Sequence, residues 1–298
     1  MIDQRLSAMN YKTRETVSGF VFLSPNLFGF LLFNLIPILA CFLISFTQWN
    51  LSNYPEFVGI RNYAIIFNDV LFWKYLWNSF YYAFLTVPGT IIVGFVLALL
   101  LNQKIRGMVF FRTVYFLPSV TLIVAVAVIW SWIYNADFGL LNYTLGLFGI
   151  EGPNWLQSKT WAMPAIIVMG IWKGSGYSML IYLAGLQNIP YEYYEAAEVD
   201  GANWYQKIRF VTLPLIFPTT FFIMITSTIG AIQGFDQFYV MTRGGPAGAT
   251  TTLVYYIFEN AFEWFKMGYA STTAVILFII IMTITLIQWK FSRGLSEI

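Results

Sequence analysis

Long apolar runs alternate with short polar segments along this chain. Six runs are long enough to cross a hydrocarbon core of roughly 30 Å, which takes about 20 helical residues. They lie at 20–46, 76–101, 113–134, 161–183, 211–232 and 270–289. The bilayer core accepts only helices and closed barrels, and a barrel would alternate polar and apolar residues, which these runs do not. The pattern therefore predicts an all-α polytopic membrane protein with six transmembrane helices.

Composition and charge refine this picture. The chain is 58% apolar and 20% aromatic, with a mean hydropathy of +0.67, which is typical of integral membrane proteins. If the N-terminus is cytoplasmic, ten of the sixteen Lys and Arg residues fall in inside segments, five in outside segments, and Lys173 within a span. This bias predicts that both termini, and the segment 189–214, are cytoplasmic.

Several kinds of chemistry are missing from the sequence. There is no histidine, which excludes His-dependent triads and His-liganded metal sites. The single cysteine, Cys41, can make no internal disulfide. No phosphate-binding G-x(4)-G-K-[ST] loop occurs in the sequence. We therefore predict that the chain is not an enzyme and that it has no catalytic residue, no metal site and no cofactor of its own.

The segment 189–214 is a charged, helix-prone stretch between two apolar runs. Glu192, Glu195 and Glu198 recur every three residues and form an acidic stripe near a helix N-terminus, where the helix dipole favours negative charge. Gly201 is placed to end this helix, because glycine adopts a positive φ at little cost. From the residues alone, a docking helix and an ordinary solvated loop remain alternatives.

A second amphipathic piece follows at 202–210 and leads to Leu213-Pro214. We expect the proline to break the helical pattern there, where the next span begins.

The charged segment also contains a longer motif, which runs from Glu195 to Pro214. Glu195-Ala196-Ala197, then Gly201, then Leu213-Pro214 twelve residues beyond the glycine, resembles the E-A-A-x(3)-G-x(9)-I-x-L-P signature of ABC importer permeases, with Val211 in place of isoleucine. Further residues resemble the sugar-transporting, maltose-permease-like branch: Gly59, Asn62-Tyr63, Arg112-Thr113, Leu117-Pro118, Trp172-Lys173-Gly174, Leu186-Gln187-Asn188-Ile189-Pro190, Phe235-Asp236 and Gly244-Gly245-Pro246.

The resemblance implies a role for the charged segment. In that family it is a cytoplasmic coupling helix that docks on a separate ATPase, and the position of Glu195 ion-pairs with a basic residue of that ATPase. The residues implied to couple are Glu195, Ala196, Ala197, Asp200, Gly201, Leu213 and Pro214. The implied partners are a second permease subunit, two copies of the ATPase that carry ATP and magnesium, and an extracytoplasmic sugar-binding protein. The implied location is a prokaryotic plasma membrane, and no nucleic acid is involved.

Polar residues within apolar spans are the candidates for a substrate path, because they are costly there and are usually functional. By resemblance to maltose-type permeases, the matching positions are Ser119, Lys173, Gly174, Tyr177, Ser227, Gly230, Ala231 and Gly234. Gln233 is added for its polarity alone. An aromatic face with hydrogen-bonding neighbours suits a sugar. The alternatives are helix packing for Tyr177, the serines and the glycines, and a structural partner, such as a carboxylate or carbonyls, for Lys173.

Together, the sequence pattern and the resemblance predict that the chain is a permease subunit of an ATP-driven sugar or oligosaccharide importer. One outer helix lies in residues 1–75, and a five-helix core with the coupling loop 189–214 lies in residues 76–298. The main alternative is an ion-coupled secondary transporter of small polar solutes, which would be expected to carry midplane carboxylates. An intramembrane Ser–Lys enzyme is a weaker alternative, because Ser175 and Lys173 point about 200° apart on a helix.

Overall fold

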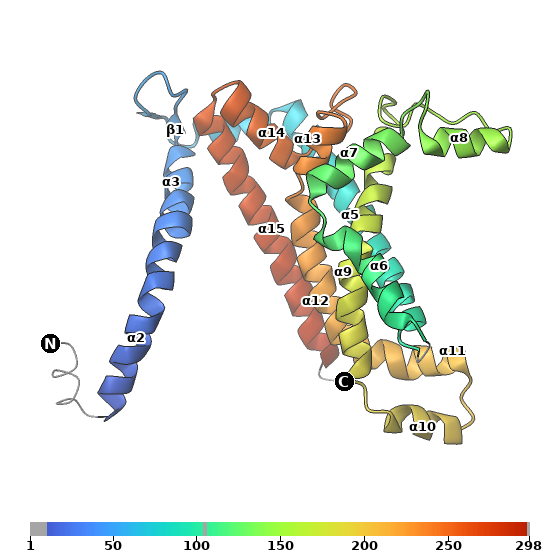
Figure 1. Ribbon diagram of the computed structural model, residues 1–298. Helices are drawn as coiled ribbons and strands as arrows, with labels where there is room; N and C mark the ends of the chain where they lie inside the picture. Colours follow the sequence, from blue (N-terminus) through green and yellow to red (C-terminus); the bar gives the residue numbers. More distant parts are fainter. Residues whose placement is uncertain (1–10, 104–105, 297–298) are drawn as a thin grey trace. The chain divides into compact units, whose positions relative to one another are not determined.

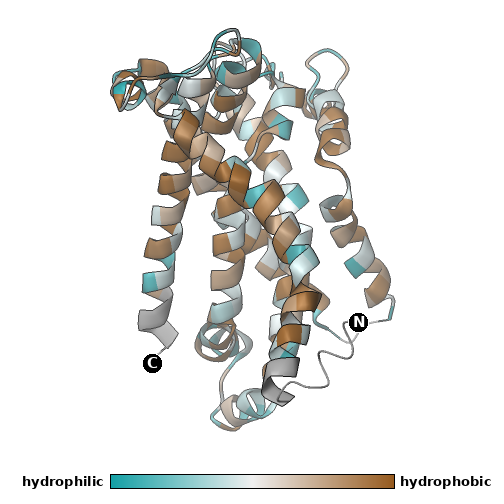
Figure 2. Cartoon of the chain, turned by 90° about the vertical axis from the view of Figure 1, so that its left-hand side faces the viewer, coloured by the Kyte–Doolittle hydropathy of each residue, from teal (hydrophilic) through white to brown (hydrophobic). Residues whose placement is uncertain are grey.

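The computed structural model describes residues 11–103 and 106–296. The chain forms two compact units, one from residues 1–66 with 260–275 and the other from residues 67–259 with 276–298. In both units the long helices are dominated by apolar residues, and hydrophilic residues gather in the segments that connect them (Figure 2). This distribution is that of a protein whose helices face lipid rather than water.

The first unit begins with one long helix and a short hairpin. The helix consists of α2 (Tyr11–Phe30), a π-helical turn η1 (Leu31–Leu35) and α3 (Ile36–Ile44). Strands β1 (Thr47–Gln48) and β2 (Glu56–Phe57) then pair antiparallel, with Thr47 opposite Phe57 and Gln48 opposite Glu56. The buried amide of Asn62, in α4 (Arg61–Phe67), donates to the carbonyls of Ser45 (3.0 Å) and Thr47 (2.8 Å) and holds the chain at this turn.

The second unit contains most of the long helices and the loops between them (Figure 1). Its elements are α5 (Val70–Leu101), α6 (Met108–Val120), α7 (Ile123–Ile133), α8 (Leu140–Leu147), α9 (Ala162–Gln187), α10 (Glu192–Val199), α11 (Trp204–Lys207), η2 (Ile208–Thr212), α12 (Leu213–Ile232), α13 (Asp236–Met241) and α14 (Leu253–Phe258). The turn η3 (Glu259–Glu263) and α15 (Met267–Ser296) each cross the boundary between the units.

Five helices of the described part are long and apolar enough to span a membrane, or six if the bent pair α6 and α7 counts as one span. The all-α fold and the number of spans are therefore confirmed. The third span is the exception to the expected straight helices. It was predicted as one run at 113–134, but α6 and α7 meet at an angle of 99°. Thr121 and Leu122 at the break are extended, with ψ of 141° and 131°.

The fifth span also differs from expectation. It runs without a break from Trp204 to Ile232, through α11, η2 and α12. The prediction that Pro214 breaks the helix is wrong, because the helix continues through Pro214, which lies directly after the π-helical turn η2. The π-helical turn η2 absorbs the irregularity instead. The charged segment is thus joined directly to a membrane span.

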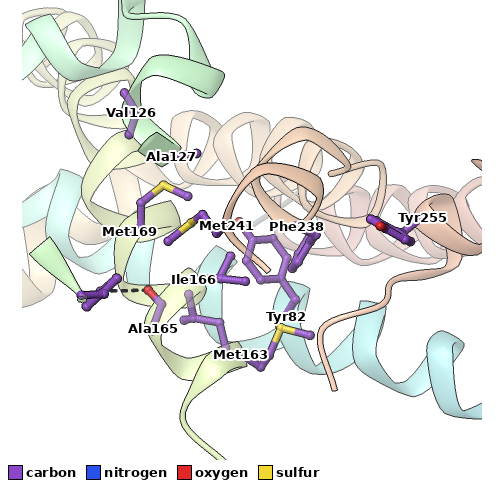
Figure 3. Packing of buried hydrophobic residues seen from close by; sticks show 12 residues of the cluster. Tyr82, Val126, Ala127, Met163, Ala165, Ile166, Met169, Phe238, Met241 and Tyr255 are labelled. Carbon is purple, nitrogen blue, oxygen red and sulfur yellow. Dashed lines mark hydrogen bonds between the residues drawn. The ribbon is translucent and has the colours of Figure 1, made fainter. Parts of the chain in front are cut away.

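A close-packed core holds the second unit together. Tyr82 of α5, Met169 of α9 and Phe238 and Met241 of α13 belong to one buried cluster (Figure 3). The rings of Tyr82 and Phe238 meet edge to face at 4.9 Å between centroids, a favourable geometry for aromatic pairs. The α5–α9 pair is close enough that a Cβ added to Gly94 would lie 2.6 Å from the Cβ of Ser178. Small residues permit this approach, as at many membrane helix interfaces.

Candidate functional site

A cavity of about 290 Å³ lies within the second unit, where α5, α6, α7, α9, α12 and α13 converge. Its lining is Tyr82, Thr86, Val87, Thr90, Ser119, Ile123, Met169, Gly170, Lys173, Gly174, Tyr177, Ser178, Thr226, Ser227, Gly230, Ala231 and Gln237. Hydroxyl and amide groups therefore meet two tyrosine side chains and one ammonium inside a largely apolar helical unit.

The structure brings together most of the residues predicted for a substrate path. Seven of them line this cavity, namely Ser119, Lys173, Gly174, Tyr177, Ser227, Gly230 and Ala231. Tyr177 is 51% exposed, and a Cβ added to Gly230 would meet nothing within 4 Å, so both positions face open space. The cavity brings these residues to one place, and their contact with a substrate remains a prediction.

Gln233 and Gly234 do not line the cavity. Helix α12 ends at Ile232, so Gln233 is the C-cap residue, with an exposed side chain. A Cβ on Gly234 would lie 2.5 Å from Nε2 of Gln237, so this glycine permits a close turn between α12 and α13. Gln233 lies at the end of α12 that lines the cavity. The helix ends at Ile232, however, and the side chain of Gln233 is not part of the lining.

Lys173 is bonded to the break between α6 and α7. Its Nζ donates to the carbonyl oxygens of Pro118 (3.4 Å) and Ser119 (3.2 Å), and Oγ of Ser119 donates to the Lys173 carbonyl (3.0 Å). These carbonyls belong to the last turn of α6, where the helix dipole favours a positive charge. Lys173 therefore has the carbonyl partners that its structural role would require. It also lines the cavity in which a substrate path is predicted.

Close packing of α9 on α6 fixes these bonds. A Cβ added to Gly176 would touch the carbonyl oxygen of Tyr115 and would lie 2.6 Å from Oγ of Ser119. Only glycine permits this crossing without displacement of the α6 backbone. The crossing places Ser119 beside Lys173, and so it builds one wall of the cavity.

The predicted coupling segment forms an exposed helix at the opposite end of the long helices from α13 (Figure 1). Glu195, Ala196 and Ala197 lie in α10, and Asp200 is its C-cap. Gly201 has a φ of +77°, as expected for a residue that ends a helix in the left-handed conformation. Leu213 and Pro214 are separate from α10, in the first turn of α12.

Local hydrogen bonds set the shape of the turn after α10. The Gly201 N–H donates to the Glu198 carbonyl (3.0 Å), and the Ala202 N–H donates to the Ala197 carbonyl (2.8 Å). Asn203 and Gln206 then form a reciprocal capping box, at 2.9 and 2.7 Å, that starts α11. Both ends of the loop are therefore fixed by the residues that the sequence provides there.

The sequence matches a family model over residues 64–296, and that family is described as the inner membrane component of binding-protein-dependent transport systems. The chain belongs to this family. It is therefore a component of a membrane transporter rather than a catalytic enzyme.

The similarity to known proteins extends over most of the chain. The sulfoquinovosyl glycerol transport system permease protein SmoG of Agrobacterium fabrum is 38% identical, over 86% of this chain and 84% of that protein. The trehalose/maltose transport system permease protein MalF of Thermococcus litoralis is 33% identical, over 95% of this chain and 96% of that protein. A crystal structure of a bacterial ABC transporter that imports alginate has a TM-score of 0.84 and 22% identity, over 95% of this chain and 97% of that chain. This last likeness shows the fold.

The permease cavity has a wall that sequence reasoning missed. Tyr82, Thr86 and Thr90 follow one another at four-residue spacing on α5 and line the cavity, and Gln237 of α13 donates to the Tyr82 hydroxyl at 3.4 Å. The sequence did contain a signal for this wall, because two threonines and a tyrosine recur at helical spacing within an apolar span. The resemblance to maltose-type permeases implies substrate contacts from the third, fourth and fifth spans, and α5 is not among them.

Proposed function

We propose that this permease conducts a sugar or oligosaccharide through the cavity described above, driven by a separate ATPase that docks on α10. In this proposal two permease subunits form the translocation path, two ATPase subunits bind ATP and magnesium on the cytoplasmic side, and an extracytoplasmic binding protein delivers the sugar. The chain itself holds no nucleotide. Both termini and α10 are cytoplasmic.

The chemistry of the cavity is the observation that carries the proposal. An exposed aromatic side chain, Tyr177, lies among hydroxyl groups from Ser119, Thr90 and Ser227. A sugar presents an apolar ring face and an edge of hydroxyls, so it complements such a lining. The names of the relatives, which include permeases for trehalose/maltose and for sulfoquinovosyl glycerol, support the same class of substrate.

The lining also argues against the ion-coupled alternative. Among the described residues that line the cavity, none is Asp or Glu, and Lys173 is the one charged side chain. Proton or sodium coupling at the middle of a membrane usually needs a carboxylate or a ring of carbonyls that can bind the cation. Energy must then come from outside the span, and α10 offers an exposed surface for an ATPase.

The direct test is transport by the complete complex in proteoliposomes. The complex is purified through a tag on this chain, its subunits are identified, and uptake of radiolabelled trehalose, maltose and lactose is measured with ATP, with ADP, and with a proton gradient alone. The proposal expects co-purification of an ATPase and uptake of at least one sugar that requires ATP. Uptake driven by the proton gradient without ATP would contradict the proposal, as would purification of a complex that contains no ATPase.

A further inference from the structure

Helix α10 contacts the rest of its unit chiefly through η2, the π-helical turn at the base of α12. A cavity of about 320 Å³ lies beside this contact, where the ends of α5 and α9 meet α10, α11 and η2, and Tyr194, Glu198, Lys207 and Thr212 are part of its lining. A force applied to α10 can therefore reach α12 through η2, in addition to the backbone connections of α10 to α9 and α11.

A chain of hydroxyl groups joins α10 to this turn. The hydroxyl of Tyr194 lies 3.1 Å from Oγ1 of Thr212, and Oγ1 of Thr212 donates to the Lys207 carbonyl at 3.3 Å. Since Thr212 has one hydroxyl hydrogen, it accepts from Tyr194 while it donates to Lys207. Thr212 is 2% exposed, whereas Tyr194 is partly exposed and both residues line the cavity of about 320 Å³. π-Helical turns within α-helices frequently occur at functional sites.

An ion pair supports the same link. Nζ of Lys207 lies 2.6 Å from Oε1 of Glu198, which joins the last turn of α10 to α11. Such partly exposed pairs contribute little to stability. Together with the hydroxyl chain, however, the ion pair connects α10 to the following helix at two points, and two contacts resist rotation better than one.

The helix beyond the link reaches the substrate cavity. From Trp204 to Ile232 it is continuous, so Thr212 and Ser227 are about 22 Å apart along the helix axis at 1.5 Å per residue. Ser227 and Gly230 line the cavity. A displacement at Thr212 is therefore carried along one stiff helix to the cavity wall.

We propose that the Tyr194–Thr212 hydroxyl pair, braced by Glu198–Lys207, transmits movement of α10 to α12 and so to the cavity. These are positioning residues, because they touch neither nucleotide nor sugar. The inference rests on the proposed function, since it assumes that an ATPase moves α10. It adds to that function by assigning the transmission to particular side chains of α10, α11 and η2.

The test follows cavity access and needs no knowledge of the sugar. A single reporter cysteine, Gly230→Cys, is placed in a Cys41→Ser background, because a Cβ at Gly230 meets nothing within 4 Å. The ATPase–permease complex is reconstituted in nanodiscs. The rate of labelling by a membrane-impermeant maleimide is then compared between the nucleotide-free complex and the complex trapped with ATP and vanadate.

We expect trapping to change the labelling rate in the otherwise wild-type complex. Tyr194→Phe and Thr212→Val should each reduce that change by about fivefold, the order of effect expected for loss of one hydrogen bond. Thr212→Ser keeps the hydroxyl and should retain the change. Tyr193→Phe is the matched control, because Tyr193 is exposed and its hydroxyl makes no hydrogen bond within the described residues. The double variant should be no worse than either single variant.

Two results would overturn the inference. One is an unchanged nucleotide response in both Tyr194→Phe and Thr212→Val. The other is loss of ATPase co-purification in these variants, which would make the pair a structural contact rather than a transmitting one. The reporter complex that keeps Tyr194 and Thr212 is the control. If trapping with ATP and vanadate left its labelling rate unchanged, that result would instead contradict the proposed function itself.

Discussion

Gly176→Ala should loosen the crossing of α6 and α9 that builds the cavity wall. The new Cβ would touch the Tyr115 carbonyl oxygen and would lie 2.6 Å from Oγ of Ser119 and 3.2 Å from Cα of Phe116. Two of these atoms are backbone, so a change of side-chain rotamer cannot remove the clash. Overpacking of this kind costs about 1–3 kcal/mol, and the better helix propensity of alanine returns up to about 1 kcal/mol. The expected net loss of unfolding free energy is therefore between about 0 and 3 kcal/mol, with a middle value of about 1.5 kcal/mol.

Gly230→Ala makes the same chemical change without the clash. A Cβ at Gly230 would meet nothing within 4 Å, so the free energy of unfolding should stay the same or rise by up to about 1 kcal/mol. The added methyl group nevertheless enters the cavity. Gly230→Ala should therefore reduce sugar uptake without loss of stability, whereas Gly176→Ala should reduce both.

Thermal unfolding of the purified protein, followed by circular dichroism, separates the two variants. A loss of 1 kcal/mol lowers Tm by about 2–4 °C for a protein of this size, so Gly176→Ala should unfold measurably earlier than Gly230→Ala. Uptake in proteoliposomes at a temperature well below both Tm values gives the second readout. Equal Tm values for the two variants would refute the close packing that we derive for Gly176.

Three further changes test other parts of the proposal. Glu195→Lys reverses a charge on the exposed face of α10 and should abolish ATPase recovery while the protein still inserts; normal recovery and uptake would exclude α10 as the docking helix. A reporter that is active only outside the cell should score at Ala247 and not at Asn203, and an outside signal at Asn203 would reverse the orientation. Lys173→Met should reduce the yield of folded protein, because its two hydrogen bonds from a charged donor contribute about 1.5–3 kcal/mol each at most, whereas the exposed Tyr177→Ala should assemble normally and lose uptake; normal transport in both would remove them from the path.

Much of the membrane topology could be predicted, because crossing a bilayer imposes a minimum apolar length that is visible in sequence. The break between α6 and α7 could not be predicted in the same way. Both halves are apolar, and hydropathy records length but not direction. The break occurs just after Pro118, at Thr121 and Leu122, where the backbone is extended and Lys173 from another helix binds the freed carbonyls.

The cavity lining likewise contains residues that the sequence could identify and others that only the structure could place. Ser119, Lys173 and Ser227 were identifiable because polar side chains in apolar spans are costly and therefore informative. Thr86 and Thr90 carry the same signal, but a threonine in a membrane helix can also bond its own backbone. Only the approach of α9 shows which way they face, with Gly174 close to Thr90.

By itself, the sequence determined the all-α class, the spans, the exposed charged helix and the glycine that ends it. Each of these depends on local rules: apolar length, helical spacing and the positive φ that glycine adopts at little cost. The tertiary structure alone decided the 99° break, the continuous helix through Pro214 and the hydroxyl link from Tyr194 to Thr212. These features arise from contacts between segments far apart or across a turn, where packing and hydrogen bonds override the local preference of the chain.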